Sequence, residues 1–195
     1  MNLINKYWPN LGGVIGFAII TTILLNGRQV FSIQSLTWLH LAILLLHQFE
    51  EYSIPGKFKE FYNTNIWNKN PITRFELNHK GILIVNVILA WTAYLIAAIY
   101  GEKLIWLTIG LSGLTILNGI MHTFMFFMLK KYNPGLITGL LIFIPFGIFL
   151  LTRIAGNIEQ KYWMMGLIVF IIGTVSIPLT IKLTNKTTVP NKVYK

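Results

Sequence analysis

Residues 104–129 read LIWLTIGLSGLTILNGIMHTFMFFML, a run without a charged side chain that is bounded by Lys103 and Lys130. A membrane-spanning helix needs about 20 consecutive apolar residues, so this stretch is long enough to cross a bilayer. It is much longer than the ~9–11 residues of a membrane β-strand, and its polar and apolar residues do not alternate. The stretch therefore predicts a transmembrane helix and an all-α fold.

The composition of the whole chain has the same character. Of its 195 residues, 54% are hydrophobic and 11% are charged, against about 25% charged residues in ordinary soluble domains. The mean hydropathy is +0.63. A water-soluble globule of this length could not bury so much apolar surface, which excludes a cytosolic enzyme, a disordered chain and a secreted scaffold. The chain has no Cys, so disulfides, thiolate metal ligands and a Cys nucleophile are excluded too.

Six runs are apolar enough, or nearly so, to cross the membrane, and they predict a single polytopic helix bundle over residues 1–195. The second run has the shortest purely apolar stretch and carries two His and two Glu, so we expect it to face other helices rather than lipid. The expected spans, about six in number, are 8–26, 36–52, 81–100, 104–129, 135–152 and 162–183.

The Lys and Arg residues between these runs predict the orientation. Twelve of the 16 fall in the N-terminus, the 53–80 loop, the 130–134 loop and the C-terminal tail, which share one side of the membrane. The positive-inside rule then places both termini in the cytoplasm of a multi-pass cell-membrane protein. This topology explains the net charge of +10, so we expect the lipid bilayer as the partner and no nucleic acid.

The long 53–80 loop mixes aromatic and basic side chains. This mixture is typical of the headgroup layer and predicts an interfacial segment on the cytoplasmic membrane surface, with an ordinary solvated loop as the alternative. The basic residues include Lys57, Lys59 and Arg74, and the aromatic residues are Phe58, Phe61, Tyr62, Trp67 and Phe75.

Residues 47–51 read HQFEE, and they carry the first candidate site. His47, Glu50 and Glu51 are three and four residues apart, so one helix face presents an imidazole beside two carboxylates. Ionisable groups are costly in hydrocarbon, and adjacent Glu side chains repel each other unless a proton or a cation lies between them. The pattern predicts acid/base chemistry or a metal site. The alternative is that both Glu end the helix at the interface and are hydrated.

Asn118 and His122 form the second cluster, four residues apart on one face of the fourth run. His47 and His122 are about four and eight residues from the cytoplasmic ends of their helices, which places them ~6 and ~12 Å deep. Asn86 enters the third run from the same side. We therefore expect these groups to meet, with ring nitrogens about 3–5 Å apart if His47 and His122 share a metal.

Two further features flank these clusters. His40 lies two helical turns before His47, where it could extend a polar track toward the outer leaflet, but we expect a buried, hydrogen-bonding His. The turn Tyr132-Asn133-Pro134-Gly135 joins the fourth and fifth runs on the same side as both clusters.

Three motifs therefore occur in order: HxxEE from His47 to Glu51, NxxxH from Asn118 to His122, and YxPG from Tyr132 to Gly135. Together they resemble the HXXEE domain family of multi-pass bacterial membrane proteins, over about residues 40–150. The resemblance implies a membrane enzyme without a defined reaction. The functional residues that it implies are His47, Glu50, Glu51, Asn118, His122, Tyr132 and Gly135.

The residue types favour a metal-dependent mechanism. His47 and His122, with one or both of Glu50 and Glu51, could bind a divalent Zn, Fe or Mn ion, and the remaining Glu would act as general base on a bound water. Asn118 would hold a substrate oxygen. In a metal-free alternative without a cofactor, a Glu–His pair moves protons. Asn86, Tyr132 and Gly135 are the candidate substrate-binding residues.

The substrate expected for such a site is a lipid or another amphiphile that enters from the inner leaflet. A small ion-coupled transporter or channel that uses the same His and Glu residues is the second hypothesis. A transport path needs polar groups that reach the outer face. Beyond His40 the outer halves of the helices have few, and Trp38, Thr92 and Thr108 do not form such a path. A membrane scaffold, in which the polar residues only hold helices together, is the third.

Overall fold

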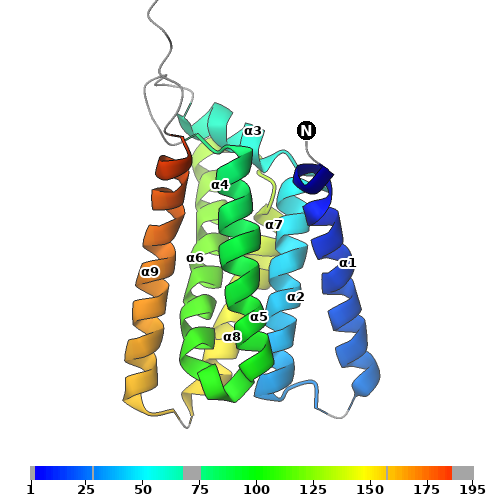
Figure 1. The fold of residues 1–195 in the computed structure, drawn as a ribbon, viewed down its shortest axis with the longest axis vertical. Coiled ribbons are helices and arrows are strands. Elements are labelled where there is room, and N and C mark those ends of the chain that lie inside the picture. The colour runs from blue at the N-terminus through cyan, green and yellow to red at the C-terminus, as the bar shows by residue number, and fades with distance from the viewer. Residues whose placement is uncertain (1–2, 28, 68–75, 157, 186–195) are drawn as a thin grey trace, which may run out of the picture.

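A computed structural model describes residues 3–27, 29–67, 76–156 and 158–185, and within them every regular element is a helix. The prediction of an all-α fold is therefore confirmed, and Figure 1 shows the long helices side by side in one bundle. In chain order the elements are α1 (Leu3–Asn26), α2 (Ile33–Tyr52), α3 (Phe58–Tyr62), the π-helix η1 (Asn63–Trp67), α4 (His79–Leu83), the π-helix η2 (Ile84–Trp91), α5 (Thr92–Tyr100), the 3₁₀-helix η3 (Gly101–Leu104), α6 (Ile105–Leu129), α7 (Leu136–Thr138), the π-helix η4 (Gly139–Phe143), α8 (Ile144–Ala155) and α9 (Gln160–Thr184).

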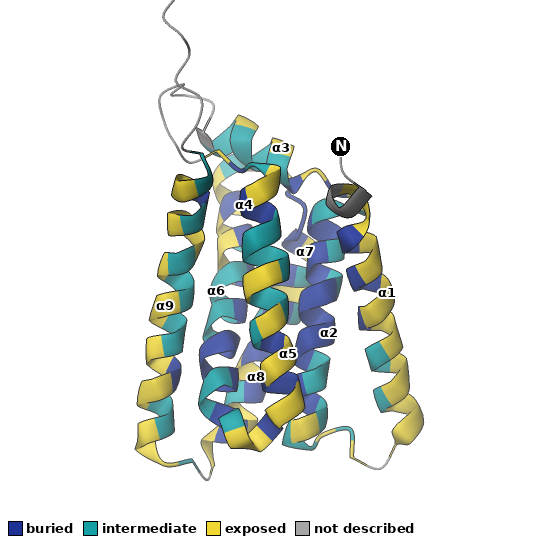
Figure 2. Cartoon of the chain, viewed as in Figure 1, coloured by how far each residue is buried: buried dark blue, intermediate teal, exposed yellow. Residues whose placement is uncertain are grey.

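The outer surface of the bundle is apolar. Large hydrophobic side chains are exposed along α1 and α9, whereas α2 lies in the buried centre (Figure 2). Among the described residues, four helical stretches are long and apolar enough to cross a membrane: Lys6–Asn26, His79–Leu129, Leu136–Ala155 and Gln160–Thr184. These stretches support the prediction of a membrane protein. The count of six crossings and the cytoplasmic location of both termini stay predictions.

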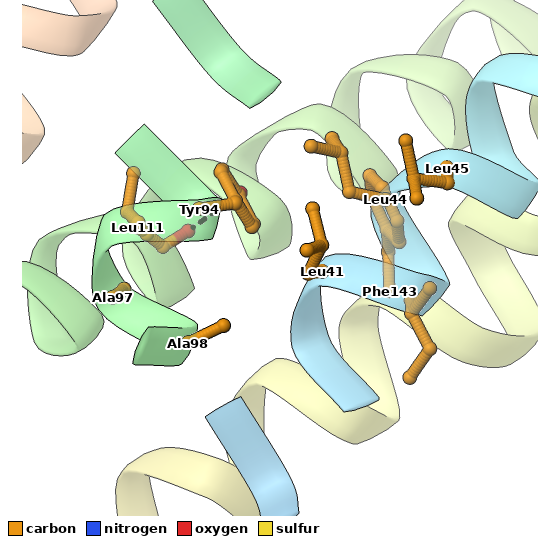
Figure 3. Packing of buried hydrophobic residues seen from close by; sticks show 9 residues of the cluster. Leu41, Leu44, Leu45, Tyr94, Ala97, Ala98, Leu111 and Phe143 are labelled. Atoms are coloured by element: carbon orange, nitrogen blue, oxygen red, sulfur yellow. Dashed lines mark hydrogen bonds between the residues drawn. The ribbon is translucent and has the colours of Figure 1, made fainter. Parts of the chain in front are cut away.

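Helix α2 is enclosed by its neighbours, as its polar content requires. It begins at the N-cap Ser32, whose side chain accepts a hydrogen bond from the Ser35 amide. Its Leu41, Leu44 and Leu45 pack in one buried cluster with residues of α5, α6 and η4 (Figure 3). The two His and two Glu residues of α2 are thus buried among other helices, in agreement with the expectation from sequence.

The chain reverses direction at Gly101, between α5 and α6 (Figure 1). Gly101 has a φ of 51°, and a Cβ there would collide with the Gln34 side chain, which donates a hydrogen bond to the Ala98 carbonyl. This contact ties the start of α2 to the end of α5.

Within the 53–80 loop, the described residues 53–67 and 76–80 lie at the end of the bundle where α1 begins and α9 ends (Figure 1). It contains α3 and η1, and the Asn63 side chain closes it by bonding to the backbone of Leu77 through both its oxygen and its nitrogen, at 2.8 and 3.0 Å. Residues 68–75, which include Arg74 and Phe75, lie outside the described residues, as does the Trp67 side chain. The interfacial position of the loop stays a prediction.

Candidate metal centre

Side chains from α2 and α6 meet at a buried site near this end of the bundle. His47 and Glu51 lie one turn apart on α2, and His122 faces them from α6, with all three buried. Glu51 Oε1 is 3.7 Å from His47 Nε2 and 3.2 Å from His122 Nε2. The ring centroids of the two histidines are 5.0 Å apart. The expectation that the two sequence clusters meet is confirmed for these three residues.

Each histidine ring is held through its Nδ1 atom. His47 Nδ1 is 2.7 Å from Thr138 Oγ1, and His122 Nδ1 is 2.6 Å from Asn133 Oδ1. His47 Nε2 is buried and has no hydrogen-bond partner within the described part of the chain. Buried polar atoms without a partner are rare in proteins. This nitrogen is therefore a candidate for binding a ligand from outside the chain.

The three groups therefore present ligand atoms to one point. One atom from each of His47, Glu51 and His122 lies within 4.8 Å of the other two. Ligands about 2.0–2.2 Å from a tetrahedral zinc ion are roughly 3.3–3.6 Å from one another. The two distances to Glu51 Oε1, 3.7 and 3.2 Å, are close to this range, and the widest spacing of up to 4.8 Å would contract by about 1 Å on binding. Two imidazoles and a carboxylate suit Zn, Fe or Mn and leave coordination positions open for other ligands.

Glu50 points to a different group of atoms. Its Oε1 accepts hydrogen bonds from the Tyr132 hydroxyl (2.7 Å) and the Ile137 amide (3.1 Å). Its Oε2 accepts from the Thr138 amide (2.8 Å) and hydroxyl (2.5 Å). The carboxylate thus accepts hydrogen bonds from backbone amides in the first turn of α7, which have no carbonyl partner within the helix. A negative charge is favourable at this position. The structure does not group Glu50 with the three candidate ligands, although the sequence led us to expect it there.

The 132–138 segment covers the site. The Tyr132 side chain is 41% exposed at the surface, and partial burial together with its hydrogen bond to Glu50 raises the pKa of its hydroxyl, which stays a donor. Gly135 has a φ of 97°, and a Cβ there would lie 2.5 Å from His122 Cε1 and 3.0 Å from Glu51 Cγ. Only glycine fits here, so Gly135 lets the backbone close directly over the candidate ligands rather than binding through a side chain.

A second close approach brings η4 to α6. A Cβ at Gly119 would lie 2.5 Å from the Gly139 carbonyl oxygen, and one at Gly139 would lie 3.4 Å from His122 Cβ. Backbone contact between the two helices is possible because neither residue has a side chain. It brings the Thr138 hydroxyl within reach of His47.

Aromatic rings enclose the ligand atoms. The Phe143 ring lies 4.0 Å from the His47 ring, and Phe58 of α3 lies 5.1 Å from the His122 ring, between centroids. Such neighbours keep water away and strengthen electrostatic interactions inside the site. A separate cavity of about 680 Å³ lies between α1 and the first turns of α2, lined by residues that include Ile19, Gln34 and Trp38, and contains none of the candidate ligands.

The two asparagines expected at the site are placed differently. Asn118 is half-buried one turn before His122, and its side chain makes no hydrogen bond in the described ranges. Asn86 accepts a hydrogen bond from Gln48 at 3.1 Å and donates to the Ile82 carbonyl and, at 3.5 Å, to the Tyr52 hydroxyl. Asn86 therefore belongs to a network on another face of α2.

His40 is a buried, hydrogen-bonding residue, as we expected from the sequence. Its Nε2 is 2.8 Å from Thr115 Oγ1, which is 2.7 Å from the Tyr94 hydroxyl. Tyr94 in turn donates to the Leu111 carbonyl. These contacts link α2, α5 and α6 in the middle of the bundle.

Thr138 and Asn133 are the site residues that sequence reasoning missed. Asn133 lies inside the Tyr132–Gly135 turn, where it counted only as a turn residue, and Thr138 follows one helical turn later. Their proximity to the histidines depends on how this segment folds back over α2 and α6. The position of Asn133 within the motif was the one signal that could have identified it.

Comparison with known proteins identifies the region that carries the site. A family model described as a protein of unknown function with an HXXEE motif matches residues 38–150, more than half of the chain. No curated protein and no solved structure matches the chain. The matched range contains the three candidate ligands and the whole 132–138 segment.

Proposed function

The chain belongs to the HXXEE family, and on that premise we propose that it is a membrane enzyme whose site is a divalent metal ion held by His47, Glu51 and His122. The observation that carries the proposal is the convergence of three buried ligand atoms within 4.8 Å, one of them a histidine nitrogen that no other group in the described part of the chain hydrogen-bonds. A structural role would satisfy these atoms with hydrogen bonds, as it does at His40.

A bound ion would supply Lewis acidity and a nucleophilic water at neutral pH. The residues of the chain have distinct roles around it. His47, His122 and Glu51 hold the ion, and the closed aromatic surroundings exclude bulk water. Glu50 accepts four hydrogen bonds from the 132–138 segment, so it anchors that segment. The oxygen of Glu51 that does not bind the ion is then the one left for proton transfer. The Asn118 amide is available to bind a substrate oxygen.

The proposed substrate is a lipid or another amphiphile, and the proposed reaction is hydrolysis or related acid/base chemistry. The site lies beneath Tyr132 and Ile137, both exposed, at the end of the bundle that carries α3. A molecule in the adjacent leaflet would meet the 132–138 segment first. Thr138, half-buried, is the residue of this segment that contacts both Glu50 and His47.

We also propose six membrane crossings, with both termini in the cytoplasm. The stretch His79–Leu129 has 51 residues, about twice the length of one crossing, and the chain turns back within it at Gly101. Helix α2, enclosed by its neighbours, adds the remaining crossing. With α1 beginning and α9 ending at one end of the bundle, the excess of Lys and Arg at that end favours the cytoplasmic side.

An ion-coupled transporter is less well supported than an enzyme. A transport path needs continuous polar groups between His47 and the opposite end of the bundle. Leu44 lies one turn from both His40 and His47, and Phe143 stacks on His47. This apolar layer separates the candidate metal centre from the His40 network.

Metal analysis of the purified protein tests the proposal. The chain in detergent would be stripped with a chelator, incubated with Zn²⁺, Fe²⁺ or Mn²⁺ under anaerobic conditions, desalted and measured by mass spectrometry of the metal. We expect about one ion per chain for one of these metals, and much less for His122→Ala. If none of the metals binds to the folded wild-type chain, the metal-dependent mechanism is wrong.

Hydrolysis is tested separately on vesicles of a mixed phospholipid extract. We expect products from the metal-loaded wild-type protein and none from Glu51→Gln, while Glu159→Gln, at the other end of the bundle, keeps the wild-type rate. Equal product formation by the wild-type and Glu51→Gln proteins would contradict the assigned site.

A further inference from the structure

We propose that Thr138 and Asn133 are positioning residues that keep a proton on Nδ1 of His47 and His122, so that both Nε2 atoms are directed at the metal position. Glu50, the first glutamate of the HxxEE motif, acts on the site through Thr138. The inference rests on the proposed metal centre and explains why the motif contains two adjacent glutamates with different partners.

The contacts of Thr138 determine the tautomer of His47. The Thr138 hydroxyl is 2.5 Å from Glu50 Oε2, which also accepts the Thr138 amide, and a carboxylate offers only acceptors. The hydroxyl proton therefore goes to Glu50. The lone pair that remains on Thr138 Oγ1, 2.7 Å from His47 Nδ1, has to accept a proton from that nitrogen. His47 Nε2 then carries a lone pair when the ring is neutral.

Asn133 does the same for His122 by a different route. The Asn133 amide nitrogen donates to the backbone carbonyl of His122 at 3.0 Å, which fixes the orientation of the side-chain amide. Its oxygen then faces His122 Nδ1 at 2.6 Å and can only accept. The His122 ring is thereby protonated at Nδ1, and its Nε2 atom, 3.2 Å from Glu51 Oε1, shares one proton with that carboxyl group, which a metal ion would displace.

Both constraints act in the same direction. A neutral imidazole with its proton on Nε2 cannot bind a metal through that atom, so each positioning residue removes a competing state of the ring. Partners of this kind orient metal ligands in many sites, and their loss lowers metal affinity by about 10–100-fold. Glu50 has four donors, two of them backbone amides, so Thr138 cannot turn away without leaving an acceptor unpaired.

The decisive variants are Thr138→Val and Thr138→Ser. Valine keeps the shape of threonine and the backbone amide bond to Glu50 but lacks the hydroxyl, whereas serine keeps the hydroxyl. We expect Zn²⁺ affinity, measured by competition with a chelator, to fall about 10–100-fold in Thr138→Val and to stay within about threefold of wild type in Thr138→Ser. Similar affinity in Thr138→Val and wild type, or an equal loss in both variants, would overturn the proposal.

The ring tautomers give a readout that does not depend on metal binding. In metal-free protein labelled with ¹⁵N-histidine, we expect the nitrogen shifts to report a protonated Nδ1 in both His47 and His122 and an unprotonated Nε2 in His47, assigned with the single His variants. Thr138→Val should change the His47 signals and leave those of His122. Asn133→Leu should do the reverse, with Asn133→Asp, which keeps the acceptor, as its control.

These measurements separate the two proposals. A wild-type chain that binds no metal but has both rings protonated at Nδ1 contradicts the proposed function and supports the positioning roles. A Thr138→Val protein that melts at a lower temperature but keeps wild-type tautomers and Zn²⁺ affinity would show that Thr138 is only structural, which overturns the inference.

Discussion

His40 and His47 lie two turns apart on α2, and both are buried, yet their surroundings differ. The Nε2 atom of His40 is bonded to Thr115, and the chain of contacts continues through Tyr94 to a backbone carbonyl. The Nε2 atom of His47 has no hydrogen-bond partner among the described residues and lies 3.7 Å from Glu51 Oε1, which is in turn 3.2 Å from His122 Nε2. The first region is closed, because the protein satisfies its own polar groups. The second is open to an additional ligand.

This difference shows that burial alone does not identify a functional histidine. Both residues are fully buried in α2, which other helices of the bundle enclose. What distinguishes them is whether the ring nitrogen that faces inward has a partner. The four predictions below test that distinction, from the largest expected effect to the smallest.

Glu51→Gln should have the largest effect on metal binding. Its carboxylate is the charged group that faces both Nε2 atoms, and removing one partner of a buried charged pair costs about 3–5 kcal/mol. We expect the Zn²⁺ dissociation constant, measured by chelator competition, to rise on the order of 1000-fold.

Glu159→Gln is the matched control for this change. Glu159 pairs with Lys161 at 2.8 Å, and both side chains are mostly exposed. Wild-type affinity is expected. An equally large loss in this variant would mean that the effect of Glu51→Gln does not come from the site.

His47→Leu and His40→Leu should separate the two regions directly. The first variant removes a candidate ligand, so Zn²⁺ affinity should fall at least about 100-fold. This exceeds the usual loss when a residue that only orients a ligand is removed. The second removes the His40 contact of Thr115, which then keeps only its bond to Tyr94. Its free energy of unfolding should fall by about 1–3 kcal/mol with unchanged affinity. Metal titration and thermal melting in detergent measure both quantities. The comparison fails if both variants lose metal to the same extent.

Gly135→Ala should disturb the open region through its backbone. A left-handed conformation costs a residue with a Cβ about 1–2 kcal/mol, and the added carbon would press on His122. We expect a lower melting temperature and Zn²⁺ affinity reduced about 10–30-fold.

Gly156→Ala serves as the control for Gly135→Ala. Gly156 has a φ of −69°, and a Cβ there would meet no atom of the described residues within 4 Å. Melting temperature and affinity should both match wild type, and a loss of affinity here would undermine the explanation given for Gly135.

Tyr94→Phe should have the smallest effect and only on the closed region. The variant loses the hydroxyl that contacts Thr115 and the Leu111 carbonyl but keeps the aromatic ring in its buried cluster (Figure 3). The free energy of unfolding should fall by about 1 kcal/mol. Zn²⁺ affinity should stay at the wild-type value, and a tenfold change would indicate that the two regions are coupled.

The sequence by itself determined the helices and the meeting of His47 with His122. Apolar runs as long as 104–129 can satisfy their backbone groups in lipid only as helices, whatever they pack against. The shared depth of the two histidines followed from counting residues to the ends of these helices. Those inferences depend on distances along the chain, which the sequence contains.

The tertiary structure alone decided which glutamate belongs to the site and what orients the rings. Glu50 and Glu51 are about 100° apart around α2, on either side of the direction of His47, so both satisfied the sequence pattern. Only the packing of α6 and of the 132–138 segment against α2 directs Glu51 to the histidines and Glu50 to Thr138. Asn133 and Thr138 were missed for the same reason, because a contact made by a turn folding back depends on backbone approach at Gly135, Gly119 and Gly139, which no local pattern specifies.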